Sequence, residues 1–268
     1  MNEFARCLVP DGLWDITESL IPVAPKRAQG GGIARSDNRQ VFAAMVFVLT
    51  SGCAWRHLPP TFGVSYQTAH RRFAEWSEAG LWAKLHRAML DRLGSAGDID
   101  WSRAIVDGAS LRAKKGGSLT GPNPVDRGKA GSKIHVLTDR NGLPLVLAVS
   151  AANLHDSQAL EPLVQGIPKI RSQRGPRRRK PAKLHADKAY DIPDCHRTLR
   201  ERRIGDRIAR RGIESSTRLG RHRWVVERTI AWLGGYRRLI LRYERHGHLF
   251  AAFLALAAAI TCYKKLTN

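Results

Sequence analysis

The apolar pattern of this chain changes at Trp101, where the spacing of amphipathic helices gives way to the short apolar runs of β-strands. Residues 132–153 contain two such runs separated by Asn141 and Gly142, a pair typical of a tight hairpin turn. Downstream the pattern alternates between helix and strand, at residues 156–166, 183–187, 194–203 and 205–212. Three antiparallel strands followed by this alternation predict an α/β fold with a mixed sheet covered by helices.

The part of the chain before this change has the pattern of a helical bundle. Residues 11–93 contain several amphipathic segments. Ser36 or Asp37 is expected to cap a helix that ends at Gly52, and Ser65 to cap the next one. We therefore expect a helical domain at residues 1–95 and an α/β domain at residues 96–268.

The helix that begins after Ser65 has two distinct faces. One face is expected to be buried and consists of Tyr66, Ala69, Phe73 and Trp76. The other face is expected to be exposed and consists of Gln67, Thr68, Arg71 and Arg72. A helix, a short turn and a second helix with such side chains are typical of a helix-turn-helix DNA reader. An ordinary bundle with a solvated basic face explains this segment equally well.

The charge of the chain indicates its partners. It has 45 lysines and arginines against 23 acidic residues, a net charge of +22, which favours phosphate polymers or an anionic membrane surface. The longest apolar run, Leu249 to Ile260, is too short to span a membrane and predicts a buried helix. No signal peptide is expected at the start. The four cysteines are far apart, which argues against a zinc site and fits a reducing cytoplasm. Nucleic acid in the cytoplasm is the expected partner.

Two basic segments are candidates for contact with phosphates. Residues 167–183 contain no acidic residue and include Arg177, Arg178 and Arg179. The second segment follows the first predicted strand and includes Arg112, Lys114 and Lys115. Each is either a solvated loop or an arm that contacts the DNA backbone.

Three carboxylates have positions that suit a metal centre. Asp107 and Asp187 each end a predicted strand, and Glu227 lies on a later helix. Taken singly, each has a structural interpretation, as a turn former, a cap or a surface ion-pair partner. If the two strands are parallel neighbours, however, both aspartates lie at one edge of the sheet, where α/β folds build their sites. Converging carboxylates repel one another, and Mg²⁺ ions relieve that repulsion. Arg223, one helical turn before Glu227, is expected to be its ion-pair partner or a phosphate clamp.

These stretches resemble the DDE transposases of bacterial insertion sequences, in their insertion-sequence-five-like branch. The similar phrases are GCAWRHLPPTFG, HRRFAEW, VDGASLRAKKGGSLTGPNPVDRGKAGSKIHVLTDRNGLPL, SAANLHDS, ADKAYD and RWVVERTIAWLGGYRRL. The resemblance implies a ribonuclease-H-like catalytic domain with Asp107, Asp187 and Glu227 as its catalytic and metal-binding triad. It also implies Mg²⁺-dependent strand cleavage and strand transfer, with Mn²⁺ as a substitute metal, and an N-terminal domain that recognises terminal inverted repeats.

The chain departs from the wider signature of this family near Glu227. A tyrosine and a lysine of the signature are replaced by Gly220 and Gly234, and we consider as substitutes Arg221, Arg237 and Arg238. Trp224 is expected to pack in the core, with stacking on an unpaired base as the alternative. His135 and His155 are expected to have structural roles.

The expected partner is double-stranded DNA, both the element ends and the target, bound by a homodimer or higher oligomer. The expected location is the cytoplasm, in association with the nucleoid and without a membrane. Two other functions are alternatives to this one. A nuclease on the same fold would cleave without joining strands. A DNA-binding repressor would require that one of the three acids be missing, and it is disfavoured because all three are present.

Overall fold

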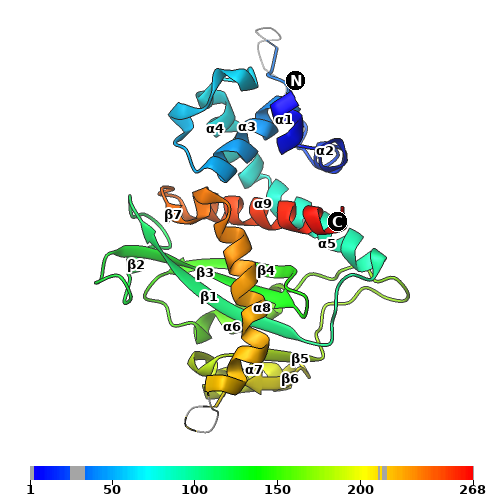
Figure 1. Cartoon of the computed structure of the whole chain (residues 1–268), viewed down its shortest axis with the longest axis vertical. Coiled ribbons are helices and arrows are strands. Elements are labelled where there is room, and N and C mark those ends of the chain that lie inside the picture. Colours follow the sequence, from blue (N-terminus) through cyan, green and yellow to red (C-terminus); the bar gives the residue numbers. More distant parts are fainter. Residues whose placement is uncertain (1–2, 25–33, 211, 213–215, 268) are drawn as a thin grey trace.

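A helical unit lies above an α/β unit in this molecule (Figure 1). The computed structural model describes residues 3–24, 34–210, 212 and 216–267, with side chains from Arg223 onward in the last range. The expected change from helices to strands is confirmed, because the first strand begins at Ala104.

The helical unit has the expected caps. Its helices are α1 (Glu3–Leu8), α2 (Asp11–Glu18), α3 (Asn38–Ser51), α4 (Tyr66–Glu78) and α5 (Leu81–Ala96), with 3-10 turns η1 (Trp55–His57) and η2 (Pro60–Phe62) between α3 and α4. The Asp37 carboxylate accepts from the backbone N–H of Gln40, and the Ser65 hydroxyl accepts from that of Thr68. Helix α3 ends at Gly52, whose positive φ of 70° suits glycine.

The sheet has the predicted mixed topology. Its strands are β1 (Ala104–Ala113), β2 (Gly121–Pro122), β3 (Ala130–Asp139), β4 (Pro144–Ala151), β5 (Lys183–Ala186), β6 (Gly205–Ile208) and β7 (Leu241–Arg242). Strand β3 pairs antiparallel with β1 and β4, whereas β5 is parallel to both β1 and β6. The resulting central order, β4-β3-β1-β5-β6, is that of a ribonuclease-H-like sheet.

Strand β1 does not end at Asp107, which corrects the sequence prediction. It continues to Ala113 because β3 pairs with it as far as Arg112, and β7 pairs with its last residues. Glycine suits position 108 of this strand because a Cβ there would crowd its neighbours. It would lie 3.1 Å from Asp156 Oδ1 and 3.2 Å from His135 Nδ1. Asp107 therefore lies in the middle of a strand.

Helices cover both faces of the sheet. They are α6 (Ser157–Gly166), α7 (Pro193–Glu201), α8 (Ser216–Gly234) and α9 (Gly247–Leu266), with 3-10 turns η3 (Lys188–Tyr190) and η4 (Arg237–Leu239). Helix α8 crosses β1 and β3 in front of the sheet, and α6 lies behind it (Figure 1). At the start of α6 the Asp156 carboxylate pairs with Lys133 at 2.9 Å and the Ser157 hydroxyl bonds the ring of His155, so both side chains are engaged away from the helix N-terminus.

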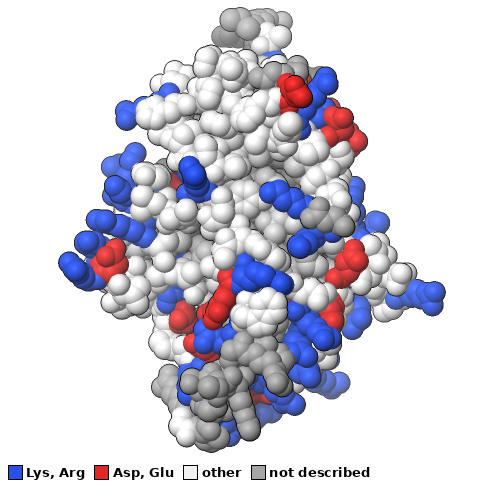
Figure 2. Space-filling view, viewed as in Figure 1, with Lys and Arg blue, Asp and Glu red and all other residues white. Residues whose placement is uncertain are grey.

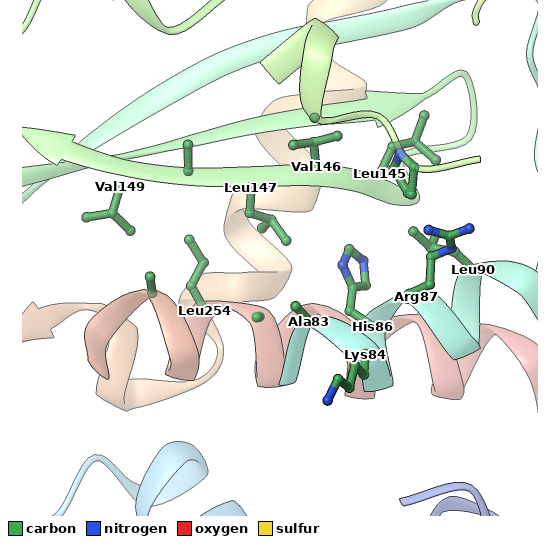
Figure 3. Close-up of a pocket in the computed structure, with 15 residues that line it drawn as sticks. Ala83, Lys84, His86, Arg87, Leu90, Leu145, Val146, Leu147, Val149 and Leu254 are labelled. Carbon is green, nitrogen blue, oxygen red and sulfur yellow. The ribbon is translucent and has the colours of Figure 1, made fainter. Parts of the chain in front are cut away.

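Helix α9 joins the two units. It packs along α5, and together these helices face the apolar side chains of β4 across a groove of about 430 Å³ (Figure 3). The buried His86 ring donates from Nε2 to the carbonyl of Pro144, and burial lowers the pKa of this histidine to about 4. By length and composition α9 has what a membrane span requires, but its most apolar window is 67% buried within the protein. The expected buried helix at Leu249–Ile260 is thus confirmed and extended.

A fully buried arginine holds β7 on the sheet. The Arg242 side chain is 1% exposed, and its guanidinium donates to four backbone carbonyls or hydroxyls within residues 118–132, as well as to the carbonyls of Glu244 and Arg245. Burial lowers its pKa because the guanidinium loses hydration, and the charge of Glu244 opposes that shift only in part. The carbonyl and hydroxyl acceptors take the place of the lost water.

We predict that Arg242→Met destabilises the protein by about 3 kcal/mol or more, because it leaves several buried carbonyl and hydroxyl groups without donors. The measurement is the free energy of unfolding, or the melting temperature, of the variant. Arg112→Met is the matched control: Arg112 lies opposite Leu241 on β1 and is exposed, so it should change stability by about 0.5 kcal/mol or less. Equal melting temperatures for both variants would contradict this role.

Candidate active site

The three carboxylates come together at one place on the sheet. Strands β1 and β5 are parallel, and Ala104 of β1 lies opposite Leu184 of β5. Asp107 and Asp187 each come three residues after this pair, so they lie at the same level of the sheet. Strand β5 ends at Ala186 and Asp187 follows directly, as predicted. Helix α8 crosses β1 and β5 here and presents Glu227. Figure 2 shows acidic side chains gathered among basic ones below the centre of this face.

The guanidinium of Arg223 lies among all three carboxylates. Its Nη2 is 3.2 Å from Asp107 Oδ2 and 3.5 Å from Glu227 Oε1, and its Nη1 is 3.9 Å from Asp187 Oδ2. The ion pair expected between Arg223 and Glu227 is therefore present. The same cation also bridges the two aspartates, a contact that sequence spacing did not predict.

Each aspartate has one oxygen fixed by the backbone and the other directed at this shared centre. Asp107 Oδ1 accepts from the N–H of Gly108 at 2.8 Å, and Asp187 Oδ1 accepts from that of Ala189 at 2.9 Å. The Oδ2 atoms are those nearest Arg223. Rigid backbone donors thus set the orientation of both carboxylates before any ligand binds.

Burial and neighbouring charges shift the pKa values of Asp107 and Arg223. Burial raises the pKa of Asp107, and the nearby Asp187 carboxylate adds to that rise, while the Gly108 N–H and the Arg223 guanidinium oppose it. For Arg223, burial alone would lower the pKa, but the carboxylates of Asp107, Asp187 and Glu227 raise it above its ordinary value. Arg223 is therefore the counter-ion that lets these acids lie together.

The donor set fits a hard divalent cation. Three carboxylates offer the oxygen ligands that Mg²⁺ and Mn²⁺ prefer. In the described part of the chain, no three acidic or histidine side chains are close enough to share one ion as they stand. Arg223 lies between them, so an ion here would take the place of its guanidinium.

Tyr190 is a further residue near the site that the sequence interpretation missed. Its ring is 1% exposed, and its hydroxyl, for which the described residues offer no hydrogen-bond partner, lies near three carboxylates. Burial, followed by the charges of Asp156, Asp107 and Asp187, raises the pKa of this phenol above its usual range. The hydroxyl therefore stays protonated. The phrase ADKAYD contained the signal, since it places this tyrosine three residues after Asp187. His135 has the expected structural role: its Nε2 bonds the Ser150 hydroxyl inside the sheet.

Helix α4 exposes some, but not all, of the side chains expected on its outer face. Gln67 and Arg71 are exposed, and Thr68 is half-buried beside its Ser65 cap. Arg72 is a correction, because it is 4% exposed, bonds Asn38, lies 3.7 Å from Glu75 and stacks on Trp76. Tyr66 is the opposite correction, because it is 42% exposed instead of buried.

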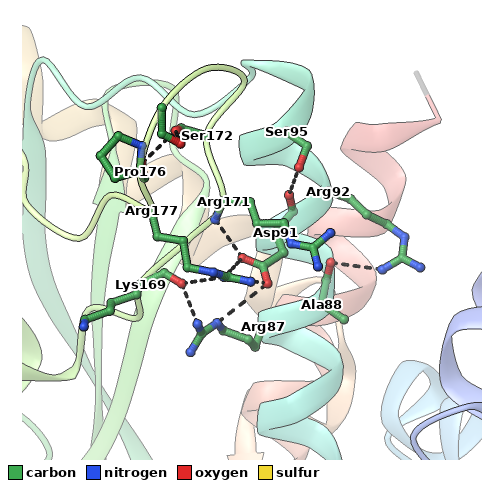
Figure 4. A network of polar contacts seen from close by, with 11 residues as sticks. Arg87, Ala88, Asp91, Arg92, Ser95, Lys169, Arg171, Ser172, Pro176 and Arg177 are labelled. Carbon is green, nitrogen blue, oxygen red and sulfur yellow. Dashed lines mark hydrogen bonds and ion pairs between the residues drawn. The ribbon is translucent and has the colours of Figure 1, made fainter.

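The basic segment 167–183 is attached to α5 (Figure 4). Arg177 donates to the Asp91 carboxylate at 2.8 Å, and the backbone N–H of Arg171 donates to the same group. Arg178 lies 5.7 Å from the Trp101 ring centroid and Arg179 donates to the carbonyl of Gln165, but both remain exposed. The segment is therefore a fixed loop, with the charge of Arg177 already paired.

The remaining candidates for contact with DNA differ in exposure. Four of the candidate cations are exposed, namely Arg112, Lys114, Lys115 and Arg237. Arg238 is a correction, because it is 5% exposed and pairs with Glu244 at 2.6 Å, which makes it unsuitable as a phosphate clamp. Trp224 is a second correction: it is 50% exposed rather than in the core, and it lies 4.6 Å from the Arg228 guanidinium. The side chain of Arg221 lies outside the described residues.

Comparisons with known proteins identify the family of the chain. Residues 9–86 match the family described as a putative transposase of the IS4/5 family, and residues 99–262 match the transposase DDE domain family. The chain is 46% identical over 147 residues to a putative transposase for insertion sequence element IS402 of Burkholderia cepacia. The aligned residues make up 55% of this chain and 70% of the relative. A second relative is an uncharacterised 16.2 kDa protein of the same element and organism. It is 38% identical to this chain, and the aligned residues make up 45% of this chain and 83% of the relative. Among solved structures, the Mos1 strand transfer complex has a TM-score of 0.32 at 11% identity and covers 95% of this chain and 82% of the other.

We predict that Arg223→Ala lowers the melting temperature in metal-free buffer by roughly 5 °C, because the carboxylates lose a counter-ion worth about 2 kcal/mol. Adding Mg²⁺ or Mn²⁺ should raise the melting temperature of this variant more than that of the parent protein, since no guanidinium has to be displaced. Arg223→Lys, which keeps the charge, should retain most of the metal-free stability. If the metal stabilises all three proteins equally, Arg223 does not lie where the metal binds.

Proposed function

The chain belongs to the transposase DDE domain family, and on that premise we propose that it binds the terminal inverted repeats of its insertion sequence and catalyses Mg²⁺-dependent DNA strand cleavage and strand transfer. The observation that carries the proposal is the convergence of Asp107, Asp187 and Glu227 on one guanidinium. A divalent metal is expected from the family, and the choice of Mg²⁺, with Mn²⁺ as a substitute, follows from the all-oxygen donor set.

In this proposal Asp107, Asp187 and Glu227 hold the metal. Bound Mg²⁺ supplies activation of a water or a 3′-hydroxyl and neutralises charge on the leaving oxygen. The Gly108 and Ala189 N–H groups keep one oxygen of each aspartate in place, so the other remains available. Arg223, released from the carboxylates, is then positioned to bind the scissile phosphate with its planar pair of donors.

The division of labour between the two units is part of the proposal. Residues 1–95 are the DNA-binding domain, with Gln67, Thr68 and Arg71 of α4 as candidate base-reading residues. Residues 96–268 are the catalytic domain. Its candidate phosphate contacts are the exposed cations Arg112, Lys114, Lys115, Arg178, Arg179 and Arg237. The active form on DNA is a homodimer or higher oligomer, located in the cytoplasm in association with the nucleoid.

We predict that Glu227→Gln reduces Mg²⁺-dependent nicking of a labelled element end by orders of magnitude while DNA binding survives or tightens. The change keeps the helix and the side-chain volume but removes a charge that holds metal and repels phosphate. Nicking and gel-shift affinity are measured on the same protein preparation. Asp107→Asn and Asp187→Asn should behave alike, and a double variant should be scarcely worse than either single one, because residues that act as a unit are not additive.

Glu161→Gln is the control for this experiment. Glu161 is exposed on α6, which lies behind the sheet, and its substitution should change neither nicking nor binding. Near-normal nicking by Glu227→Gln would contradict the proposal. Glu227 would then be only a surface ion-pair partner, and such an ion pair contributes at most about 1 kcal/mol of stability.

A further inference from the structure

A large cleft lies where the helical unit meets the end of the catalytic sheet. It encloses about 1120 Å³ between η1 and the first turn of α4 on one side, and the loop after β1 and the segment from β7 to α9 on the other. In Figure 1, α4 and β7 lie on the same side of the molecule, with β7 below the helical unit. The cleft is separate from the candidate active site, because Asp107, Asp187 and Glu227 do not line it.

The walls of the cleft are positively charged. Arg56, Lys115 and Arg245 line it from three different elements, and all three are exposed. Among the described lining residues only Glu244 is acidic, and its charge is already paired with buried Arg238 at 2.6 Å. The cleft therefore carries an excess of positive charge suited to phosphate.

Aromatic rings are interleaved with these cations. Tyr66 is 42% exposed and Tyr243 is 37% exposed, and both line the cleft, so each has ring surface available to a ligand there. The Arg238 guanidinium lies 5.3 Å from the Tyr243 ring centroid, and the Trp55 and His70 rings meet at 5.3 Å. The contact with Arg238 holds the Tyr243 ring in place. Cations together with exposed rings are the features that bind unpaired nucleotides, because a base in a duplex hides the faces that would stack.

The position of the cleft connects it to both halves of the proposed reaction. Gln67, a candidate base-reading residue, lines it from α4, and Lys115 lines it just after β1. From Asp107 to the end of β1 at Ala113 the strand extends about 20 Å at 3.3 Å per residue, a distance of roughly six nucleotide steps. A DNA strand cut at the carboxylates and running along β1 would enter the cleft about that far from the cut.

We propose that this cleft binds unpaired nucleotides of a DNA strand that extends from the cleavage site. Tyr66 and Tyr243 stack on the bases, and Arg56, Lys115 and Arg245 bind the phosphates. The assignment rests on the proposed function for its choice of DNA, and it adds a site for single-stranded DNA that the family membership does not supply.

The test compares two DNA probes in EDTA, so that binding is measured without cleavage. One probe is an element end with a single-stranded tail of about six nucleotides, and the other is a fully paired duplex of equal length. The parent protein should bind the tailed probe about tenfold more tightly. Tyr66→Ala should abolish this preference, and Tyr66→Phe should keep it because the stacking ring remains. Arg56→Ala should weaken binding to the tailed probe more than binding to the duplex, because in this proposal Arg56 contacts phosphates of the unpaired nucleotides.

A parent protein that binds both probes equally would overturn the proposal and assign the cleft to duplex backbone. Equal loss of affinity for both probes in Tyr66→Ala would overturn it too. Nicking by the parent protein is measured separately. A tail preference without any nicking would support the cleft and count against the proposed function, whereas nicking without a tail preference would overturn the cleft alone.

Discussion

The active-site geometry depends on one arginine among three carboxylates. Asp107 and Asp187 come from neighbouring parallel strands and Glu227 from a helix laid across them, an arrangement that brings like charges together. Without a cation it would resist folding, since burial and mutual repulsion both disfavour ionised carboxylates. Arg223 supplies that cation in the protein itself. The fold thus already places one cation among these three carboxylates, so metal binding there, as in the proposed function, would be an exchange of cations.

Buried arginines have a second structural role where the helical unit meets the sheet. Arg238 pairs with Glu244 and donates to the Cys53 carbonyl just after α3, so it connects both units. Arg242 fixes β7 and the 118–120 loop through hydrogen bonds to carbonyl and hydroxyl groups. Together with the packing of α9 on α5, these contacts hold the recognition candidates on α4 in a defined position relative to the sheet. In a chain of net charge +22, part of the arginine content is therefore structural.

Local patterns were enough to predict the main helices and strands of this fold, although not the short strands β2 and β7. Asp37, Gly52, Ser65 and the Asn141–Gly142 turn each fulfil their expected roles, because capping and turn formation depend on near neighbours. Predictions failed where distant residues decide. Strand β1 extends past Asp107 because β3 and β7 pair with it. The burial of Arg72, and the pairing of Arg177 and Arg238 with Asp91 and Glu244, depend on contacts that residue type and spacing do not encode. The adjacency of Asp107 and Asp187 was predictable from parallel pairing, whereas the bridge through Arg223 was not.

The most direct test of the exchange of cations is the anomalous diffraction of Mn²⁺ in crystals of the protein. The account predicts anomalous peaks among the carboxylates of Asp107, Asp187 and Glu227, with the Arg223 guanidinium displaced from the position it has here, 3.2 Å from Asp107. Crystals in which Mn²⁺ binds elsewhere, while Arg223 keeps its contacts with all three acids, would contradict it.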